Sequence, residues 1–157
     1  MSTRPSRRIR LLCGAVVASL AVLLPARAFA QLGGDAQSIE RVRVQLKASV
    51  TVTPMGRYAI HEMKAESGAT LREFASPEGR IFGVAWDGPF HPDYQQVLGP
   101  YFAQLQQAMQ ERRARREPVT IRTPDFVFQT YGHLHALGGR AFLPQMLPVG
   151  VTPEEVQ

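Results

Sequence analysis

Between residues 57 and 89, the order of hydrophobic and polar positions predicts three β-strands joined by two tight turns. Tyr58–Ala65 alternates as a half-buried strand does, and Thr70–Ala75 returns after a Glu-Ser-Gly turn. A Ser-Pro-Glu-Gly turn then leads into Ile81–Trp86 (IFGVAW), which is apolar throughout. A fully apolar strand is typical of the middle of a sheet, because both of its faces are covered. The pattern therefore predicts an antiparallel meander at the centre of the fold.

Two segments show helical periodicity instead. The longer is Tyr101–Arg116, whose glutamines lie opposite an apolar stripe formed by Leu98, Phe102, Leu105 and Met109. The shorter follows Asp35, a suitable N-cap, and places Ile39, Val42 and Leu46 on one face. We expect one long and one short amphipathic helix, both of which cover the sheet.

The C-terminal third returns to a strand pattern. Val119–Thr123 and Asp125–Tyr131 are predicted strands, Gly132-His133 is a predicted turn, and Leu134–Leu137 returns. Gly138-Gly139 then indicates a break, a bulge or a close approach of the backbone to a neighbour. A further short strand, Val50–Thr53, precedes the meander. The sequence thus predicts an α+β fold: a mainly antiparallel sheet, made of the three-strand meander plus a C-terminal hairpin, covered by one long and one short amphipathic helix.

The first 30 residues have the pattern of an export signal. A basic start with four arginines precedes an apolar run, residues 11–24, and Ala28-Phe29-Ala30 fits the small-x-small rule of signal peptidase. The apolar run is shorter than the roughly 20 residues that span a bilayer. We expect cleavage after Ala30, a single domain over residues 31–157, no stable membrane span after cleavage, and a periplasmic or secreted location.

Removing the signal changes the charge argument. The whole chain carries a formal charge of +5, but its first 30 residues hold five arginines and no acid. Residues 31–157 therefore balance 13 basic against 13 acidic residues, which argues against nucleic-acid binding. The one cysteine, Cys13, lies in the predicted signal, so we expect neither a disulfide nor a cysteine site in the mature chain.

The clearest candidate for metal chemistry is the pair His133 and His135. Two histidines at this spacing near a hairpin are a start for a Zn²⁺ or Cu²⁺ site, with His61, His91 or Asp125 as a third ligand. The alternative is that both are solvated turn residues, and on balance we expect no cofactor.

Each of the remaining sequence features can be interpreted either as functional or as purely structural. Arg112–Arg116 could bind an anionic surface, but a solvated last helical turn is the simpler reading. Gly33-Gly34 indicates a flexible mature terminus, and Asp93 a helix cap. Several aromatics could line a ligand groove, although core packing is the ordinary role of aromatics at strand spacing: Tyr58, Phe74, Phe82, Trp86, Phe126 and Phe128. No catalytic motif is present, so we predict no catalytic residue.

Five pieces of the sequence carry a resemblance to a known family. They are LGGD at Leu32–Asp35, FASPEGRIFGVAWDGP at Phe74–Pro89, DYQQVLGPYF at Asp93–Phe102, GHLHALGGRAFLP at Gly132–Pro144, and LPVGVTPEEV near the end. In this order the chain resembles a family of short exported proteins of Gram-negative bacteria whose domain has no assigned function, the DUF 2844 family. The resemblance implies an exported single domain and supplies no catalytic residue.

Two functions remain open on these grounds. The first is a non-catalytic periplasmic or secreted protein that binds another protein or the cell envelope, with apolar tail residues such as Met146, Leu147 and Val149 exposed. The second is a small-ligand or metal-binding protein, with or without enzymatic activity, that uses the His133/His135 hairpin.

Overall fold

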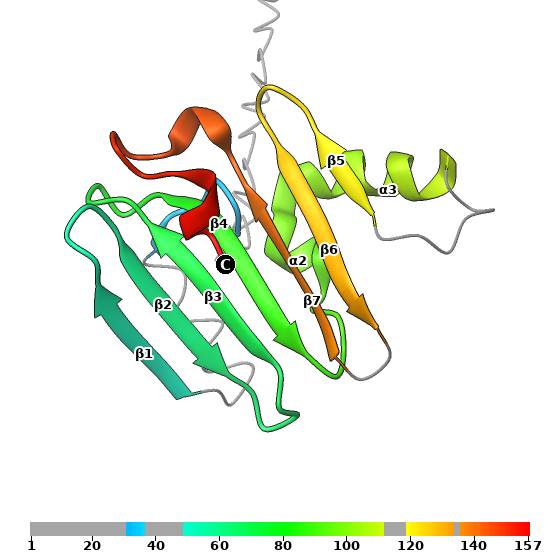
Figure 1. Ribbon diagram of the computed structural model, residues 1–157, viewed down its shortest axis with the longest axis horizontal. Helices are drawn as coiled ribbons and strands as arrows, with labels where there is room; N and C mark the ends of the chain where they lie inside the picture. The colour runs from blue at the N-terminus through cyan, green and yellow to red at the C-terminus, as the bar shows by residue number, and fades with distance from the viewer. Residues whose placement is uncertain (1–30, 37–48, 112–118, 134–135) are drawn as a thin grey trace, which may run out of the picture.

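A computed structural model describes residues 31–36, 49–111, 119–133 and 136–157. Within these ranges, seven strands form one antiparallel sheet in the order β1-β2-β3-β4-β7-β6-β5 (Figure 1). The strands are β1 (Ser49–Pro54), β2 (Ala59–Lys64), β3 (Thr70–Ala75), β4 (Ile81–Gly88), β5 (Thr120–Arg122), β6 (Val127–His133) and β7 (Ala136–Phe142). β4 is the middle strand, as its apolar sequence predicts.

One helical segment links the two halves of the sheet. It consists of α2 (Tyr94–Leu98), the 3₁₀ turn η2 (Gly99–Tyr101) and α3 (Phe102–Glu111). Asp93 is the N-cap of α2, since its carboxylate accepts hydrogen bonds from the backbone N–H groups of Gln95 and Gln96 at 3.0 and 3.3 Å. The segment leaves the end of β4 and crosses behind β7 and β6 in Figure 1 before the chain enters β5.

The predicted fold class is wrong. The structure has a single seven-stranded sheet and not a three-strand meander with a separate C-terminal hairpin, because β7 pairs antiparallel with β4 and joins both halves. Its described helices form one segment, residues 94–111, that covers part of one face. The predicted short helix after Asp35 and the run Arg112–Arg116 lie outside the described residues.

The chain reversal between β6 and β7 also differs from the prediction. β6 runs on through Gly132 and His133, and β7 begins at Ala136, so the two predicted turn residues belong to a strand. β7 is continuous across Gly138 and Gly139. These glycines are not strand breakers; they make room for rings on neighbouring strands, since a Cβ at Gly139 would lie 2.3 Å from Cζ2 of Trp86.

The helix-bearing face of the sheet holds the larger hydrophobic core. Val97, Leu98 and Leu105 of the helical segment contribute to it. The sheet and the adjoining segments supply the other fully buried members: Leu32, Met63, Ala75, Ile81, Val84, Trp86, Phe126, Phe128, Ala141 and Leu143. Burial of this many large apolar side chains is the main stabilising term of the domain.

The C-terminal tail, drawn in orange and red in front of β4, covers part of the opposite face (Figure 1). Its short 3₁₀ turns are η3 (Pro144–Met146) and η4 (Pro153–Glu155). Val156 is fully buried and packs against the backbone of Gly83, where a Cβ would approach it to 3.0 Å. Arg140 fixes the tail by donating to the carbonyls of Pro153 and Val156 at 2.8 and 3.3 Å.

A β-bulge allows β4 to contribute side chains to two cores: the helix-side core and a smaller core between the sheet and the C-terminal tail, which we call the tail-side core. Phe74 pairs with Gly83, and Ala75 pairs with Ile81, so Phe82 is an extra residue in the ladder. Val84 and Trp86 face the helices, whereas Phe82 packs into the tail-side core with Tyr58 and Phe74. Because of the extra residue, the alternation of side chains between the two faces of β4 shifts by one position at the bulge. Ile81 therefore also packs in the helix-side core.

The segment 31–36 is an integral part of the fold, contrary to the predicted flexible terminus. Leu32 is fully buried and its N–H donates to the carbonyl of Val97 at 2.9 Å. Gly33 donates to the carbonyl of Ile81 at 2.8 Å and has φ +81°, a conformation that favours glycine. The glycines thus allow the chain to pass between α2 and the start of β4.

Among the described helices, none is long and apolar enough to cross a membrane.

Candidate functional site

A pocket of about 200 Å³ lies beside Trp86 on the helix-bearing side of the sheet. We call it the Trp86 pocket. Its walls come from the β2–β3 hairpin, the end of β4, the loop that follows β4, and α2. The lining residues are Met63, Ala65, Ser67, Ala69, Thr70, Leu71, Trp86, Asp87, Phe90, His91, Pro92, Asp93, Gln96 and Val97.

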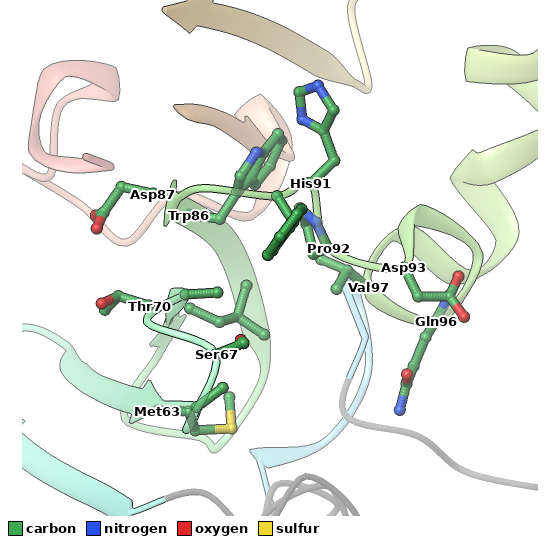
Figure 2. A pocket seen from close by; sticks show the side chains of 14 residues that line it. Met63, Ser67, Thr70, Trp86, Asp87, His91, Pro92, Asp93, Gln96 and Val97 are labelled. Atoms are coloured by element: carbon green, nitrogen blue, oxygen red, sulfur yellow. The ribbon is translucent and has the colours of Figure 1, made fainter. Parts of the chain in front are cut away.

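The strand register builds the floor of the Trp86 pocket. Met63 of β2 pairs with Leu71 of β3, which in turn pairs with Trp86 of β4. Directly paired residues of antiparallel strands share a face, so these three apolar side chains form one row. Figure 2 shows Met63, Ser67 and Thr70 on one side of the space, with Pro92, Val97 and Gln96 on the other.

Trp86 is held firmly at one end of the pocket. Its ring contacts those of Tyr94 and Phe128, with centroid distances of 5.5 and 5.6 Å. The ring also lies against the backbone of Gly139, whose lack of a side chain permits this approach. The aromatic wall is therefore fixed by three neighbouring elements before any ligand arrives.

Phe90 stands at the mouth of the pocket. Its side chain is 64% exposed, although the residue lines the same apolar space as Trp86 and Val97. A large apolar side chain left in water beside an apolar pocket is a feature of binding surfaces.

Two nitrogen atoms of pocket-lining residues are buried without a hydrogen-bond partner among the described residues: Nε1 of Trp86 and Nε2 of Gln96. A buried donor without an acceptor costs about 1–3 kcal/mol, so either group would gain from an oxygen atom supplied by a ligand or by water. The walls of the pocket are mainly apolar and suit an apolar group.

The charged groups at the rim have structural partners. Asp87 forms an ion pair with Arg72, and Asp93 caps α2. The Nδ1 atom of His91 lies 2.7 Å from the hydroxyl of Tyr94, whose pKa is raised by burial. His91 projects away from the space between the pocket walls in Figure 2. The two acids and the histidine of the described rim are thus all engaged in contacts within the fold.

Comparison with protein-family models gives one decisive match, which covers residues 28–156. The matching family is described as "Protein of unknown function (DUF2844)". The chain belongs to this family. The match confirms the resemblance of the five sequence pieces and spans the whole Trp86 pocket. A search of curated proteins and a search of solved structures found no significant match to this DUF2844 chain.

Of the two predicted metal residues, the DUF2844 domain places only His133, at the end of β6. His133 is the last residue of β6 and its backbone pairs with Ala136, while His135 and the side chain of His133 lie outside the described part of the chain. The three proposed third ligands sit on separate elements: His61 on β2, His91 after β4, and Asp125 before β6. Within the described ranges no cluster of three metal-ligating side chains occurs. Metal binding by His133 and His135 stays a prediction.

Two roles were considered for the aromatic residues, core packing and lining a ligand groove, and the structure assigns most of them to the core. Tyr58, Phe74 and Phe82 pack in the tail-side core. Phe126 and Phe128 are fully buried in the helix-side core. Trp86 does both, because its ring belongs to the core and also lines the pocket. Of the apolar tail residues, Val149 is exposed, whereas Met146 and Leu147 pack partly against the cores.

Sequence reasoning missed one unusual residue of the DUF2844 domain, Glu73. Its side chain is fully buried in β3, between His61 of β2 and Val84 of β4. Neither carboxyl oxygen has a hydrogen-bond partner in the described part of the chain, and burial raises the pKa of Glu73 to about 8. Burial also lowers the pKa of His61. The alternation Leu71-Glu73-Ala75 was the available signal, since it puts the carboxyl on the core face of the strand.

Proposed function

We propose that this protein is an exported, non-catalytic binding protein of the bacterial envelope that holds one apolar group of an envelope partner in the Trp86 pocket. The observation that carries the proposal is the pocket itself: an apolar space with a fixed aromatic wall and an exposed Phe90 at its mouth. Its rim acids and His91 are engaged in ion pairing, helix capping and a contact with Tyr94.

The size of the pocket limits what it can hold. A volume of about 200 Å³ is close to an engineered cavity of about 150 Å³ that takes up benzene. Sites for drug-sized ligands and cofactors are larger, about 300–1,000 Å³. The Trp86 pocket therefore suits a single ring or a short aliphatic side chain, which is how one anchoring residue of a protein partner is commonly held.

Export is supported by the sequence of the first 30 residues, with a basic start, a short apolar run and Ala28-Phe29-Ala30. The family match begins at residue 28 and so leaves the basic and apolar parts of this segment outside the shared domain.

Native mass spectrometry of the periplasmic fraction tests the export half of the proposal. We expect the protein expressed from the full 157-residue sequence in a Gram-negative host to be recovered there with a mass that begins at Gln31. Substituting Ala28 and Ala30 by large residues should block cleavage and leave the protein in the membrane fraction. Recovery of the intact 157-residue chain in the cytosol would refute export without bearing on the pocket.

A further inference from the structure

Strand β1 forms one edge of the sheet and has few of the features that protect edge strands. Five of its six residues are exposed, none is charged, and Val52 is 54% exposed. The opposite edge, β5, is only three residues long and includes Arg122. Short length and charge are two common ways to keep an edge from pairing with another chain. β5 has both, whereas the only interruption in β1 is its last residue, Pro54.

The sequence of β1 is self-complementary. Ser49-Val50-Thr51-Val52-Thr53 reads as hydroxyl, apolar, hydroxyl, apolar, hydroxyl from either end. If two copies pair antiparallel about a two-fold axis at Thr51, Val50 of one copy faces Val52 of the other, and Ser49 faces Thr53. Pairs of β-branched residues and pairs of hydroxyl residues both stabilise neighbouring strands.

The same axis also preserves the two faces of the sheet. Val50 and Val52 share the helix-side face with their β2 partners Met63 and His61, and Thr51 shares the other face with Glu62. A two-fold axis perpendicular to the sheet keeps each residue on its own face in both copies. On the helix-side face, Val50 of one copy, which extends the row of Met63 and Leu71, therefore meets the exposed Val52 of the second copy.

We propose that β1 is a homodimer interface: two copies of this chain pair their β1 strands antiparallel, with Thr51 opposite Thr51, and form one continuous sheet. Pairing with a strand of another protein would require an exposed edge but not a symmetric sequence. The symmetric order of hydroxyl and apolar residues in β1 therefore favours a second copy of this chain as the partner. Like charges cannot oppose each other across the interface, because β1 has no charged side chain.

Sedimentation velocity on the purified protein, over a wide range of concentration, tests this proposal. We expect the unchanged protein to dimerise as concentration rises. Thr51→Lys and Thr51→Glu should each remain monomeric, because the axis places two like charges face to face. An equimolar mixture of the two variants should dimerise again, since lysine then faces glutamate.

Thr120→Lys is the matched control. Thr120 is an exposed threonine on β5, at the opposite edge of the sheet. It lies on the same face as Thr51, because a row of directly paired residues connects the two: Glu62, Arg72, Ala85, Arg140 and Gln129. This variant should dimerise like the unchanged protein. A monomer at every concentration would overturn the proposal, and so would a dimer that survives Thr51→Lys. A monomer that binds a strand of another protein through β1 would overturn it as well.

Discussion

Gly139→Ala is expected to lower the free energy of unfolding by about 3 kcal/mol, because overpacking a rigid core site has costs of this order. A Cβ at this position would lie 2.3 Å from Cζ2 of Trp86 and 2.7 Å from the carbonyl oxygen of Gln129. Neither neighbour can retreat easily, since one is backbone and the other is an aromatic ring wedged against Tyr94 and Phe128. Urea unfolding followed by far-ultraviolet circular dichroism measures the loss.

A second substitution shows whether the clash with Trp86 is the cause. Trp86→Phe removes the larger part of the ring that the new Cβ would meet. The double variant should therefore lose less stability than the sum of the two single variants, as expected for residues in contact. Additive losses, or a Gly139→Ala variant as stable as the unchanged protein, would show that the ring does not pack against Gly139 as described.

Glu73→Gln is expected to remove a large pH dependence of stability. Folding raises the pKa of Glu73 from 4.5 to about 8 by burial, so the folded state holds its proton more tightly than the unfolded state does. Below pH 4.5 both states are protonated and the residue causes no loss. As pH rises from 4.5 to 8, the free energy of unfolding falls, by up to about 4 kcal/mol. The glutamine variant should lack this fall and be the more stable protein above pH 8.

The comparison needs two controls. Glu66→Gln changes the same functional group at an exposed position in the β2–β3 turn, and it should leave the pH dependence as it is. The lowered pKa of His61 has the opposite effect, since its contribution to stability is lost as pH falls. Because His61 pairs directly with Glu73, the comparison is repeated with His61→Gln in both proteins, which removes this second titration. Parallel curves for the unchanged protein and Glu73→Gln would mean that Glu73 is ionised in the fold without a penalty.

The strands around Trp86 could be predicted because their signals are local. Alternation and two turn sequences identify β2 and β3, and the apolar run identifies β4 as the central strand. The pairing of β4 with β7 could not be predicted in the same way. Periodicity tells which face of a strand is buried but not which strand lies beside it, and β4 and β7 are separated by the helical segment and two strands.

The glycines could be interpreted only in part, for a related reason. Local sequence leaves a break, a bulge and a close approach open at Gly139, and the position of Trp86 across the ladder decides for the close approach. Gly33 likewise indicates flexibility, although its N–H is bound to the carbonyl of Ile81. In both cases the role of the glycine depends on a contact with a residue that is distant in the sequence.

The Trp86 pocket was only half predictable. The sequence offered Trp86 as a possible groove residue, but Phe90, Gln96 and the β2–β3 turn come together with it through the register of three strands and the path of α2. Nothing in local sequence distinguishes a core tryptophan from one that also lines a pocket.

The most direct test of the account uses the fact that Trp86 is the one tryptophan in the sequence. Quenching of Trp86 fluorescence by nitrobenzene, a single-ring probe of the size that the pocket can hold, requires contact with the Trp86 ring and so reports binding beside it. We expect saturable quenching in the folded protein, about tenfold weaker binding in Phe90→Ala, and unchanged binding in the control Val149→Ala, which alters an exposed valine outside the pocket lining. No saturable quenching, or equal binding by Phe90→Ala, would contradict the claim that this pocket binds an apolar group.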